Sequence, residues 1–307
     1  MSFSSEVKQE LCALPPAAAC CKRAELAGLV ALSGSLLTDS SGGGLRIRTE
    51  NAAVAQRAYD LFTALFSVRP TRTAAQKKPS GYIHTLRLYA SQHYMQMMKA
   101  LGLVRDERVK FCADPFITAE PCCRRAFLRG AFLAGGSVNA PEKSYHLEIE
   151  THYQDLARDL VQLFADEDIT ARRVERKSNQ VIYVKDSQEI ADVLAALGAT
   201  DSALALYSIK IEKDMKNKVN RRVNCETANM TKTANTAAVQ ILAIQKIMAS
   251  PCSATLSPQL LELASLRVEN PEASLKELGA MLDVPLSKSA VSRRLQKLVD
   301  MAEGLTV

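Results

Sequence analysis

Two stretches of this chain match each other in register. Residues 20–35 read CCKRAELAGLVALSGS, and residues 122–137 read CCRRAFLRGAFLAGGS. The match continues without a gap into the segments that follow. There the paired residues are Leu45, Ile47 and Thr49 in the first copy and Leu147, Ile149 and Thr151 in the second. A register this long indicates an internal duplication, so we expect a fold with two similar halves.

The repeated stretch is predicted to be a helix in both halves, because its small residues lie close to helical spacing. These residues are Gly28, Ala31 and Gly34 in the first copy and Gly130, Ala134 and Gly136 in the second. A glycine within a helix costs about 1 kcal/mol relative to alanine, so several together suggest that another backbone packs closely there. We therefore expect the two helices to pack against each other at a pseudo-twofold axis.

Each half is predicted to continue with strands and helices in the same order, from residue alternation and helical periodicity. In the first half we expect strands at Ser35–Asp39, Leu45–Thr49, Val68–Thr73 and Tyr82–Tyr89, and a helix at 51–66. In the second half we expect strands at Ser137–Asn139, Tyr145–Glu150, Ala171–Arg176 and Val181–Lys185, and a helix at 154–165. A further helix is expected to close each half.

The two copies resemble degenerate versions of the LAGLIDADG motif, in the stretches LAGLVALSGS and LRGAFLAGGS. This resemblance implies the α+β fold of homing endonucleases, with two αββαββα halves around paired motif helices. The opening SFSSEVKQELC, the run CCRRAFLRGAFL and the later NRRVNCETANMTKT also resemble the WhiA family. That family couples such a domain to an all-α helix-turn-helix domain. The resemblance covers nearly the whole chain and implies a transcriptional regulator of sporulation or cell division in Gram-positive bacteria.

Three segments are expected from the change in character along the chain. Residues 1–205 form the duplicated domain, with halves of about 1–102 and 103–205, residues 206–226 form a basic connector, and residues 227–307 form the helical domain. The connector shows no regular apolar stripe, so we expect it to be partly ordered. Helical spacing resumes at Thr233–Ala249, with Val239, Leu242 and Ile247 as candidate core positions.

The last third of the chain carries helix-start patterns. Ser257-Pro258 is predicted to open a helix to about Val268, since serine caps helices and proline suits the first helical position. Ser274 and Glu277 form a capping-box pattern that opens a short helix to about Leu282. A third helix is expected from about Ser287 to Ala302. A short helix, a short turn and a longer basic helix are typical of a helix-turn-helix.

The third helix of this set is predicted to bury Val291, Leu295 and Leu298 on one face. The DNA-contacting residues are expected on its opposite face and flanks, namely Lys288, Ser289, Ser292, Arg293, Arg294, Gln296 and Lys297. Arginine pairs with guanine, glutamine pairs with adenine, and lysine reaches phosphate. The absence of any acid from 287 to 299 favours DNA over the solvated face of a protein-binding bundle. In the connector, phosphate contacts are expected from Lys216, Lys218, Arg221 and Arg222.

The family of nucleases that the motif resembles implies one metal-binding acid at the end of each motif helix. In this chain those places are held by Ser33 and Gly135. Two-metal cleavage of a phosphodiester needs carboxylates, which neither residue can replace. We therefore expect no nuclease activity, and a divergent endonuclease would need acids from elsewhere.

The strand that follows each motif helix differs in charge between the two halves. Arg46 and Arg48 alternate with apolar residues in the first, while Glu148 and Glu150 take the matching places in the second. The helpful charges of the second half lie on the next strand, at Arg172, Arg173, Arg176 and Lys177. Because acids repel phosphates, we favour binding of another regulatory protein, or a positioning role, over DNA reading by this domain.

Two cysteine pairs, Cys20-Cys21 and Cys122-Cys123, are the candidate zinc ligands. Adjacent cysteines are expected to point in different directions from a helix start, and their spacing is not C-x2-C. We therefore interpret them as small buried apolar residues and expect no metal or cofactor. The histidines at 84, 93, 146 and 152 show neither metal-ligand spacing nor a nucleophile partner.

The chain carries 39 basic and 33 acidic residues, for a formal charge of +6, which fits a nucleic-acid partner. No apolar run approaches the roughly 18 residues needed to cross a membrane, and the first residues do not read as a signal peptide. We therefore expect a cytoplasmic, nucleoid-associated protein that binds promoter sites in double-stranded DNA and has no membrane partner. The alternative is a protein-interaction scaffold in cell division with weak DNA binding.

Overall fold

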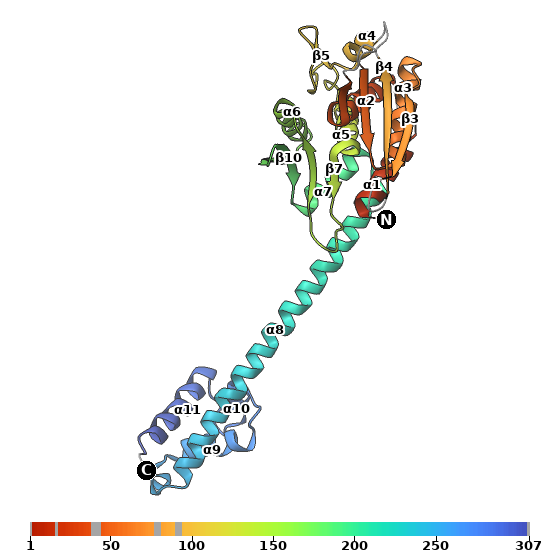
Figure 1. Cartoon of the computed structure of the whole chain (residues 1–307). Coiled ribbons are helices and arrows are strands. Elements are labelled where there is room, and N and C mark those ends of the chain that lie inside the picture. The colour runs from red at the N-terminus through yellow and green to blue at the C-terminus, as the bar shows by residue number, and fades with distance from the viewer. Residues whose placement is uncertain (1, 16–17, 38–43, 77–80, 90–93, 306–307) are drawn as a thin grey trace. The chain divides into compact units, whose positions relative to one another are not determined.

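The structure, a computed structural model, describes residues 2–15, 18–37, 44–76, 81–89 and 94–305 (Figure 1). The chain divides into two compact units, residues 1–213 and 214–307. Asp39, the expected end of the first strand, lies outside the described residues. The limits 1–205 and 227–307 stay predictions, because helix α8 crosses both of them.

The first unit contains two successive sets of helices and strands. The first set is α1 (Phe3–Ala13), α2 (Ala19–Ser33), β1 (Gly34–Leu37), β2 (Gly44–Thr49), α3 (Ala52–Phe66), β3 (Thr71–Gln76), β4 (Tyr82–Tyr89) and α4 (Tyr94–Ala100). A short hairpin, β5 (Val104–Arg105) with β6 (Arg108–Val109), follows. The second set is α5 (Pro121–Gly135), β7 (Gly136–Val138), β8 (Leu147–Thr151), α6 (Gln154–Ala165), β9 (Arg172–Arg176), β10 (Asn179–Val184) and α7 (Ser187–Leu197).

Each set forms its own four-stranded antiparallel sheet, with the strand orders β1-β2-β4-β3 and β7-β8-β10-β9. In both sheets the strands that come first, second, fourth and third along the set lie next to one another in that order, so the duplication extends to the topology. Ile47 and Ile149, which match each other in the repeat, are both buried, while Arg48 and Glu150 beside them are exposed. This alternation gives each sheet one face on the core and one face away from it. The predicted αββαββα halves are confirmed.

The motif helices α2 and α5 lie side by side in the middle of the unit (Figure 1). A methyl group added at Gly28 would lie 2.2 Å from the carbonyl oxygen of Phe127. One added at Gly130 would lie 1.9 Å from the carbonyl oxygen of Glu25. Each glycine thus faces the backbone of the other helix, as the repeated glycines predicted. The close approach depends on having no side chain at either position.

Replacement of Gly130 by alanine is expected to lower the free energy of unfolding of the first unit by about 1–3 kcal/mol, because the two helix backbones must move apart. Hydrogen exchange of peptides covering α2 and α5 would measure the loss. The control is Gly304→Ala, where the added carbon would lie 3.6 Å from the nearest atom, an ordinary contact. Equal protection of α2 in the two variants would contradict the tight packing.

A buried ion cluster joins three helices of the first unit. The Glu25 side chain on α2 is fully buried and accepts hydrogen bonds from Arg57 Nε of α3 at 2.7 Å and Arg129 Nε of α5 at 3.0 Å. Each arginine also donates to a backbone carbonyl, Arg57 to Leu14 and Arg129 to Leu197, both at 2.9 Å. The hydrogen bond to Glu25 raises the pKa of Arg57. The cluster therefore connects both halves and the ends of α1 and α7.

Helix α8 (Thr200–Met248) contains all of the predicted connector. The expectation of a partly ordered segment at 206–226 is wrong, because the range 200–248 has neither glycine nor proline to interrupt a helix. Its first turn is held by Glu10 of α1, whose carboxylate accepts from the backbone N–H groups of Asp201 at 2.8 Å and Ser202 at 3.1 Å. The negative charge of Glu10 stabilises the start of α8, because a helix N-terminus carries partial positive charge.

The exposed apolar residues of α8 correct two further expectations. Ile211, Met215, Val219 and Val223 follow one another at intervals of four and are all exposed, so the connector does carry an apolar stripe. Of the three core positions expected later in α8, Ile247 is buried, but Val239 and Leu242 are 55% and 66% exposed. Beside Ile247 the helix buries Ala243 and Ile244 in place of Val239 and Leu242, because spacing alone does not determine which face of a helix packs.

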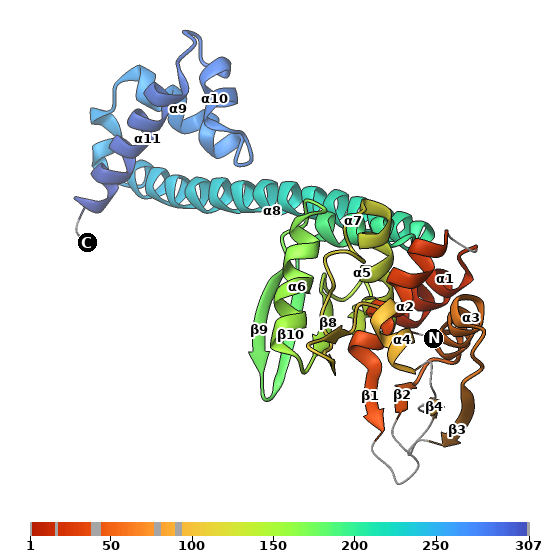
Figure 2. The same ribbon diagram turned by 90° about the horizontal axis from the view of Figure 1, so that it is seen from above.

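The second unit ends in four short elements, three of them grouped as a small helical cluster (Figure 2). They are the 3-10 turn η1 (Pro251–Thr255), α9 (Pro258–Glu269), α10 (Leu275–Met281) and α11 (Lys288–Glu303). Ser257 precedes α9 as expected, but its side chain makes no capping hydrogen bond.

None of the helices in the described ranges combines the length and apolar character needed to cross a bilayer.

Candidate nucleic-acid interface

The short helix α10 begins with the capping box that the sequence predicts. Ser274 Oγ accepts from the Glu277 backbone N–H at 3.3 Å, and the Glu277 carboxylate accepts from the Ser274 N–H at 2.7 Å. These bonds lower the pKa of Glu277. The two reciprocal bonds satisfy donors that a helix start leaves open. The start of α10 is therefore fixed by its own sequence.

The turn between α10 and α11 is held by its backbone and by α9. The Leu286 N–H donates to the Gly279 carbonyl at 2.9 Å, and a methyl group at Gly279 would lie 2.3 Å from the Leu286 carbonyl oxygen. The Asp283 N–H donates to Glu262 of α9 at 2.7 Å. The angle between α10 and α11 thus depends on a glycine that lets the turn pass close to the helix.

Helix α11 has the two faces that its sequence predicts. Ser287 caps it by accepting from the Ala290 N–H at 3.3 Å. Val291, Leu295 and Leu298 are at most 1% exposed and lie in the core of the second unit. The residues on the other side are exposed, apart from the half-buried Arg294, and comprise Lys288, Ser289, Ser292, Arg293, Gln296 and Lys297. An apolar face fixes the helix and leaves the basic face open.

The polar side chains of α11 differ in how far they are already engaged. Lys288, Arg293 and Lys297 make no side-chain hydrogen bond or ion pair within the described residues. Arg294 donates to Gln259 of α9 at 3.2 Å, and Gln296 donates to Asp300 at 2.8 Å. The Arg293 side chain is therefore unengaged, whereas Arg294 braces α11 against α9 and Gln296 is already bonded to Asp300.

Arg267 is a residue whose part in this unit the sequence did not reveal. The residue is 1% exposed, and its Nη1 donates to the carbonyls of Asn270, Pro271 and Ala273 at 3.2, 3.4 and 2.8 Å. Burial lowers the pKa of Arg267. Arg267 lies in the last turn of α9, where the sequence carries no sign of burial. It holds together the loop that leads into α10.

The predicted phosphate-binding residues of α8 are all exposed, and they fall on two sides of the helix. At 100° per residue, Lys218, Arg221 and Arg222 share one side, and Lys216 lies on the opposite side. Arg222 also donates to Glu226 at 2.9 Å, an exposed pair of the kind that solvent weakens. Three of the four residues therefore share one exposed side of α8.

The places of the nuclease acids are occupied as the sequence indicates. Ser33 Oγ donates to the Leu29 carbonyl at 2.7 Å, and a methyl group at Gly135 would lie 2.7 Å from the Glu150 carbonyl oxygen. A hollow of about 650 Å³ beside Gly135 is lined by a single carboxylate among the described residues, Glu50, and by two bases. Those bases are Lys8, whose pKa burial lowers to about 8, and Arg48. These residues do not fit a pair of divalent cations.

The outward-facing surfaces of the two sheets differ in charge, as their sequences predict. Arg46 pairs across strands with Arg87 in the first sheet. In the second sheet Glu148 lies 3.0 Å from His146 and 3.4 Å from Arg176. The register places Arg172 and Arg176 on the face of Glu148, while Arg173 points to the other side. One face is therefore basic and the other is mixed, so together they do not form a continuous basic surface for a duplex.

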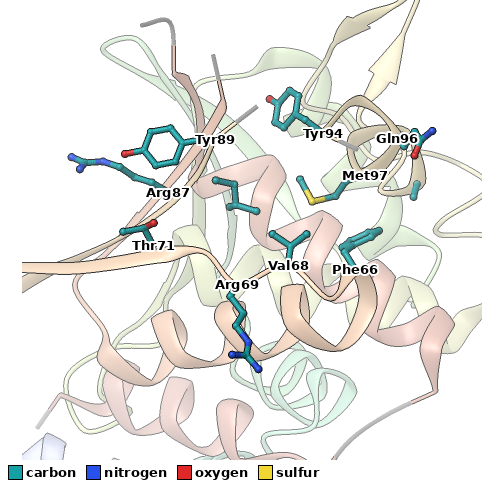
Figure 3. A pocket seen from close by; sticks show the side chains of 11 residues that line it. Phe66, Val68, Arg69, Thr71, Arg87, Tyr89, Tyr94, Gln96 and Met97 are labelled. Carbon is teal, nitrogen blue, oxygen red and sulfur yellow. The ribbon is translucent and has the colours of Figure 1, made fainter. Parts of the chain in front are cut away.

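A second hollow, of about 570 Å³, opens between α3, β4 and α4 (Figure 3). Apolar side chains such as Phe66, Val68 and Met97 form its floor, and Arg69 and Arg87 stand at its edge. The described residues that line it include no carboxylate, histidine or cysteine. Among its described lining residues, the groups that can exchange a proton are the hydroxyls of Thr71, Tyr89 and Tyr94, and burial raises the pKa of Tyr94.

The two cysteine pairs lie together, against the expectation that adjacent cysteines would point apart. The Sγ atoms of Cys20 and Cys21 are 3.9 Å apart, as are those of Cys122 and Cys123. All four Sγ atoms lie within 4.8 Å of one another. The expectation failed because it treated each pair alone, whereas the close packing of α2 on α5 brings both pairs to one place.

Comparisons with known proteins match most of the chain to three domain families. The WhiA N-terminal LAGLIDADG-like domain matches residues 19–104, the WhiA LAGLIDADG-like domain matches residues 124–216, and the WhiA C-terminal HTH domain matches residues 219–302. The chain belongs to the WhiA family. A helix-turn-helix domain is a DNA-binding module, so the family indicates a DNA-binding regulator.

Relatives and solved structures of the WhiA family cover the whole chain. "Probable cell division protein WhiA" of Alkaliphilus metalliredigens is 40% identical over 312 residues, covering 99% of this chain and 98% of the relative. The protein of the same name from Heliobacterium modesticaldum is 39% identical over 311 residues, covering 100% and 97%. The crystal structure of full-length WhiA from Thermatoga maritima covers 100% of both chains, with 27% identity and a TM-score of 0.62.

Proposed function

We propose that this WhiA-family protein is a sequence-specific DNA-binding transcriptional regulator of cell division and sporulation, without nuclease activity. The observation that carries the proposal is the open face of α11, which presents Arg293 and Lys297 and no acid from 287 to 299. Its opposite face is locked into the core of the second unit. A rigid helix with an exposed basic face suits the major groove. The site of action that follows is the nucleoid, in the cytoplasm.

The side chains of this interface divide by the chemistry of their contacts. Arg293 and Gln296 suit base edges, because arginine pairs with guanine and glutamine with adenine in the major groove. Lys288, Ser289, Ser292 and Lys297 suit phosphates and nearby edges, and Arg294 stiffens α11. Phosphate contacts that hold any sequence alike come from α8, through Lys216, Lys218, Arg221 and Arg222.

The first unit serves a different role in this proposal, namely binding of another regulatory protein. Its two outward sheet faces differ in charge, with Arg46 and Arg87 on one and Glu148 and Glu150 on the other. A duplex requires basic side chains along its whole path, whereas a protein partner can match a mixed surface. A scaffold that binds proteins and holds DNA only weakly is the second candidate function, and the same mixed faces favour it.

Selection from a pool of random duplexes by the full-length protein tests the proposal. The protein is expected to enrich one sequence motif and to protect that motif in footprinting. Because phosphate contacts release counterions, affinity should fall steeply as salt rises. A pure scaffold would enrich no motif, even at low salt, and that result would reject DNA reading.

The purified protein is expected to leave supercoiled plasmid intact in the presence of Mg²⁺ or Mn²⁺, because Ser33 and Gly135 provide no carboxylate for either cation. Agarose electrophoresis over a time course measures nicking. Any trace activity should be compared with that of Glu50→Gln, which removes the single acid from the described lining of the hollow beside Gly135. Nicking that a chelator stops and that Glu50→Gln abolishes would contradict the proposed lack of catalysis.

A further inference from the structure

Four cysteine thiols meet at the first turns of the motif helices. Cys20 and Cys21 lie in the first turn of α2, and Cys122 and Cys123 in the first turn of α5. Their four Sγ atoms all lie within 4.8 Å of one another. Across the described ranges of the chain, no other group of three or more Cys, His, Asp or Glu side chains lies close enough together to share a metal ion. The cluster is thus a distinctive feature of the first unit.

The spacing of the sulfur atoms is close to that of a tetrahedral metal site. Zinc–thiolate bonds of about 2.3 Å place the sulfurs of a tetrahedral site about 3.8 Å apart. Within each pair of adjacent cysteines, the two Sγ atoms are already 3.9 Å apart. The remaining separations are at most 4.8 Å, so a modest contraction would complete the geometry. Packing of two helices replaces the C-x2-C spacing that brings ligands together in other zinc sites.

Burial explains only half of the cluster. Cys21 and Cys123 are 8% and 5% exposed, as small apolar residues would be. Cys20 and Cys122 are exposed, so apolar packing gives no reason for a thiol at either place. A metal site requires all four, with two ligands on the core side and two on the solvent side. The exposed pair is therefore the observation that separates a metal site from core packing.

The electrostatic surroundings suit thiolates. The N-caps of both helices, Ala18 and Glu120, make no side-chain capping hydrogen bond, so open N–H groups of both first turns lie beside the cluster. A helix N-terminus carries partial positive charge and favours a thiolate. A bound cation would deprotonate all four thiols, including the buried Cys21 and Cys123, because metal coordination deprotonates a coordinating thiol.

We propose that Cys20, Cys21, Cys122 and Cys123 together bind one structural zinc ion. Zinc prefers four thiolates in tetrahedral geometry, and four protein ligands leave no position for a reacting water. The ion would join the first turns of α2 and α5 and so clamp the two halves of the duplicated unit. This assignment replaces the expectation that the pairs are only small core residues, and it stands independently of the proposed DNA binding.

The first test is the metal content of the full-length protein, expressed with added zinc and purified with a reductant and without chelator. Elemental analysis is expected to find one zinc per chain. Cys20→Ser/Cys122→Ser should retain less than about a tenth of an equivalent, since two of four ligands are lost. Both side chains are exposed, so this variant keeps the core. The matched control, Cys225→Ser/Cys252→Ser, alters two thiols of the second unit and should keep its zinc.

Cobalt provides a readout that does not depend on any variant folding. The zinc-free protein titrated with Co²⁺ should develop the visible and near-ultraviolet bands of tetrahedral thiolate coordination, saturating at one equivalent. Zinc should then displace the cobalt. The proposal would be overturned by protein that holds no metal and gives no cobalt bands. Iron in place of zinc, with its own absorption, would also contradict the assignment.

Discussion

Replacement of Glu25 by alanine is expected to lower the free energy of unfolding of the first unit by about 3–5 kcal/mol, because two buried guanidiniums lose their counterion. Arg57 and Arg129 both donate to the Glu25 carboxylate, and their side chains are only 13% and 12% exposed. Water cannot easily replace the lost acceptor at those positions. A unit that joins its halves through this cluster should lose much of its stability.

Three further variants separate the charge effect from simple packing. Glu25→Gln keeps the shape of the side chain and should show most of the loss. Glu25→Met/Arg57→Met/Arg129→Met removes all three charges and should recover much of it, since apolar groups often replace a buried ion cluster without loss. Asp155→Asn is the control, because Asp155 and Lys110 form an exposed pair at 2.9 Å that solvent weakens.

Hydrogen exchange followed by mass spectrometry suits these measurements, because peptides from α2 and α5 report on the first unit separately from the second. Protection of those peptides should fall strongly in Glu25→Ala and hardly at all in Asp155→Asn. If the two single variants lose the same protection, the buried cluster does not stabilise the unit.

Arg293→Ala is expected to weaken binding to the selected DNA motif by about 1–3 kcal/mol, since one bidentate contact to a guanine is lost. Binding to random duplexes should change far less, because it depends on phosphates. Fluorescence anisotropy with the full-length protein measures both affinities. The variant loses no side-chain hydrogen bond or ion pair, since Arg293 makes none with the described residues.

Arg221→Ala/Arg222→Ala provides the matching contrast. Both side chains are exposed on one side of α8, where the proposal assigns them to phosphates. Their loss should weaken selected and random DNA alike, and should reduce the slope of log affinity against log salt by about one unit for each contact removed. A variant that lost only the selected motif would place α8 at the bases instead.

The sequence predicted those parts of the fold that local pattern determines. The repeat at 20–35 and 122–137 predicted two equivalent halves. Gly28 and Gly130 each lie against the backbone of the other motif helix, which confirms the expected close packing. Ser274 and Glu277 predicted the start of α10, because a capping box is complete within four residues. Each of these features needs only neighbouring residues or a direct comparison of the two copies.

The features that the sequence did not predict depend on which surfaces meet in three dimensions. The ion cluster uses Glu25 and Arg129, whose matched positions in the other copy are Phe127 and Ala27, so the repeat gives no sign of it. The cysteine cluster depends on the distance between two helix starts, which no spacing along the chain encodes. The prediction that Val239 and Leu242 are buried was wrong, because periodicity does not determine which face of a helix packs against the core.

The most direct test of the central claim, that α11 reads DNA bases, is site selection carried out in parallel with the wild-type protein and with Arg293→Ala. Both full-length proteins would be given the same pool of random duplexes at the same salt concentration, and the retained duplexes would be sequenced. The wild-type protein should enrich one motif containing a guanine whose identity no longer matters in the Arg293→Ala pool. The same motif, enriched to the same degree by both proteins, would contradict base reading by Arg293 in α11.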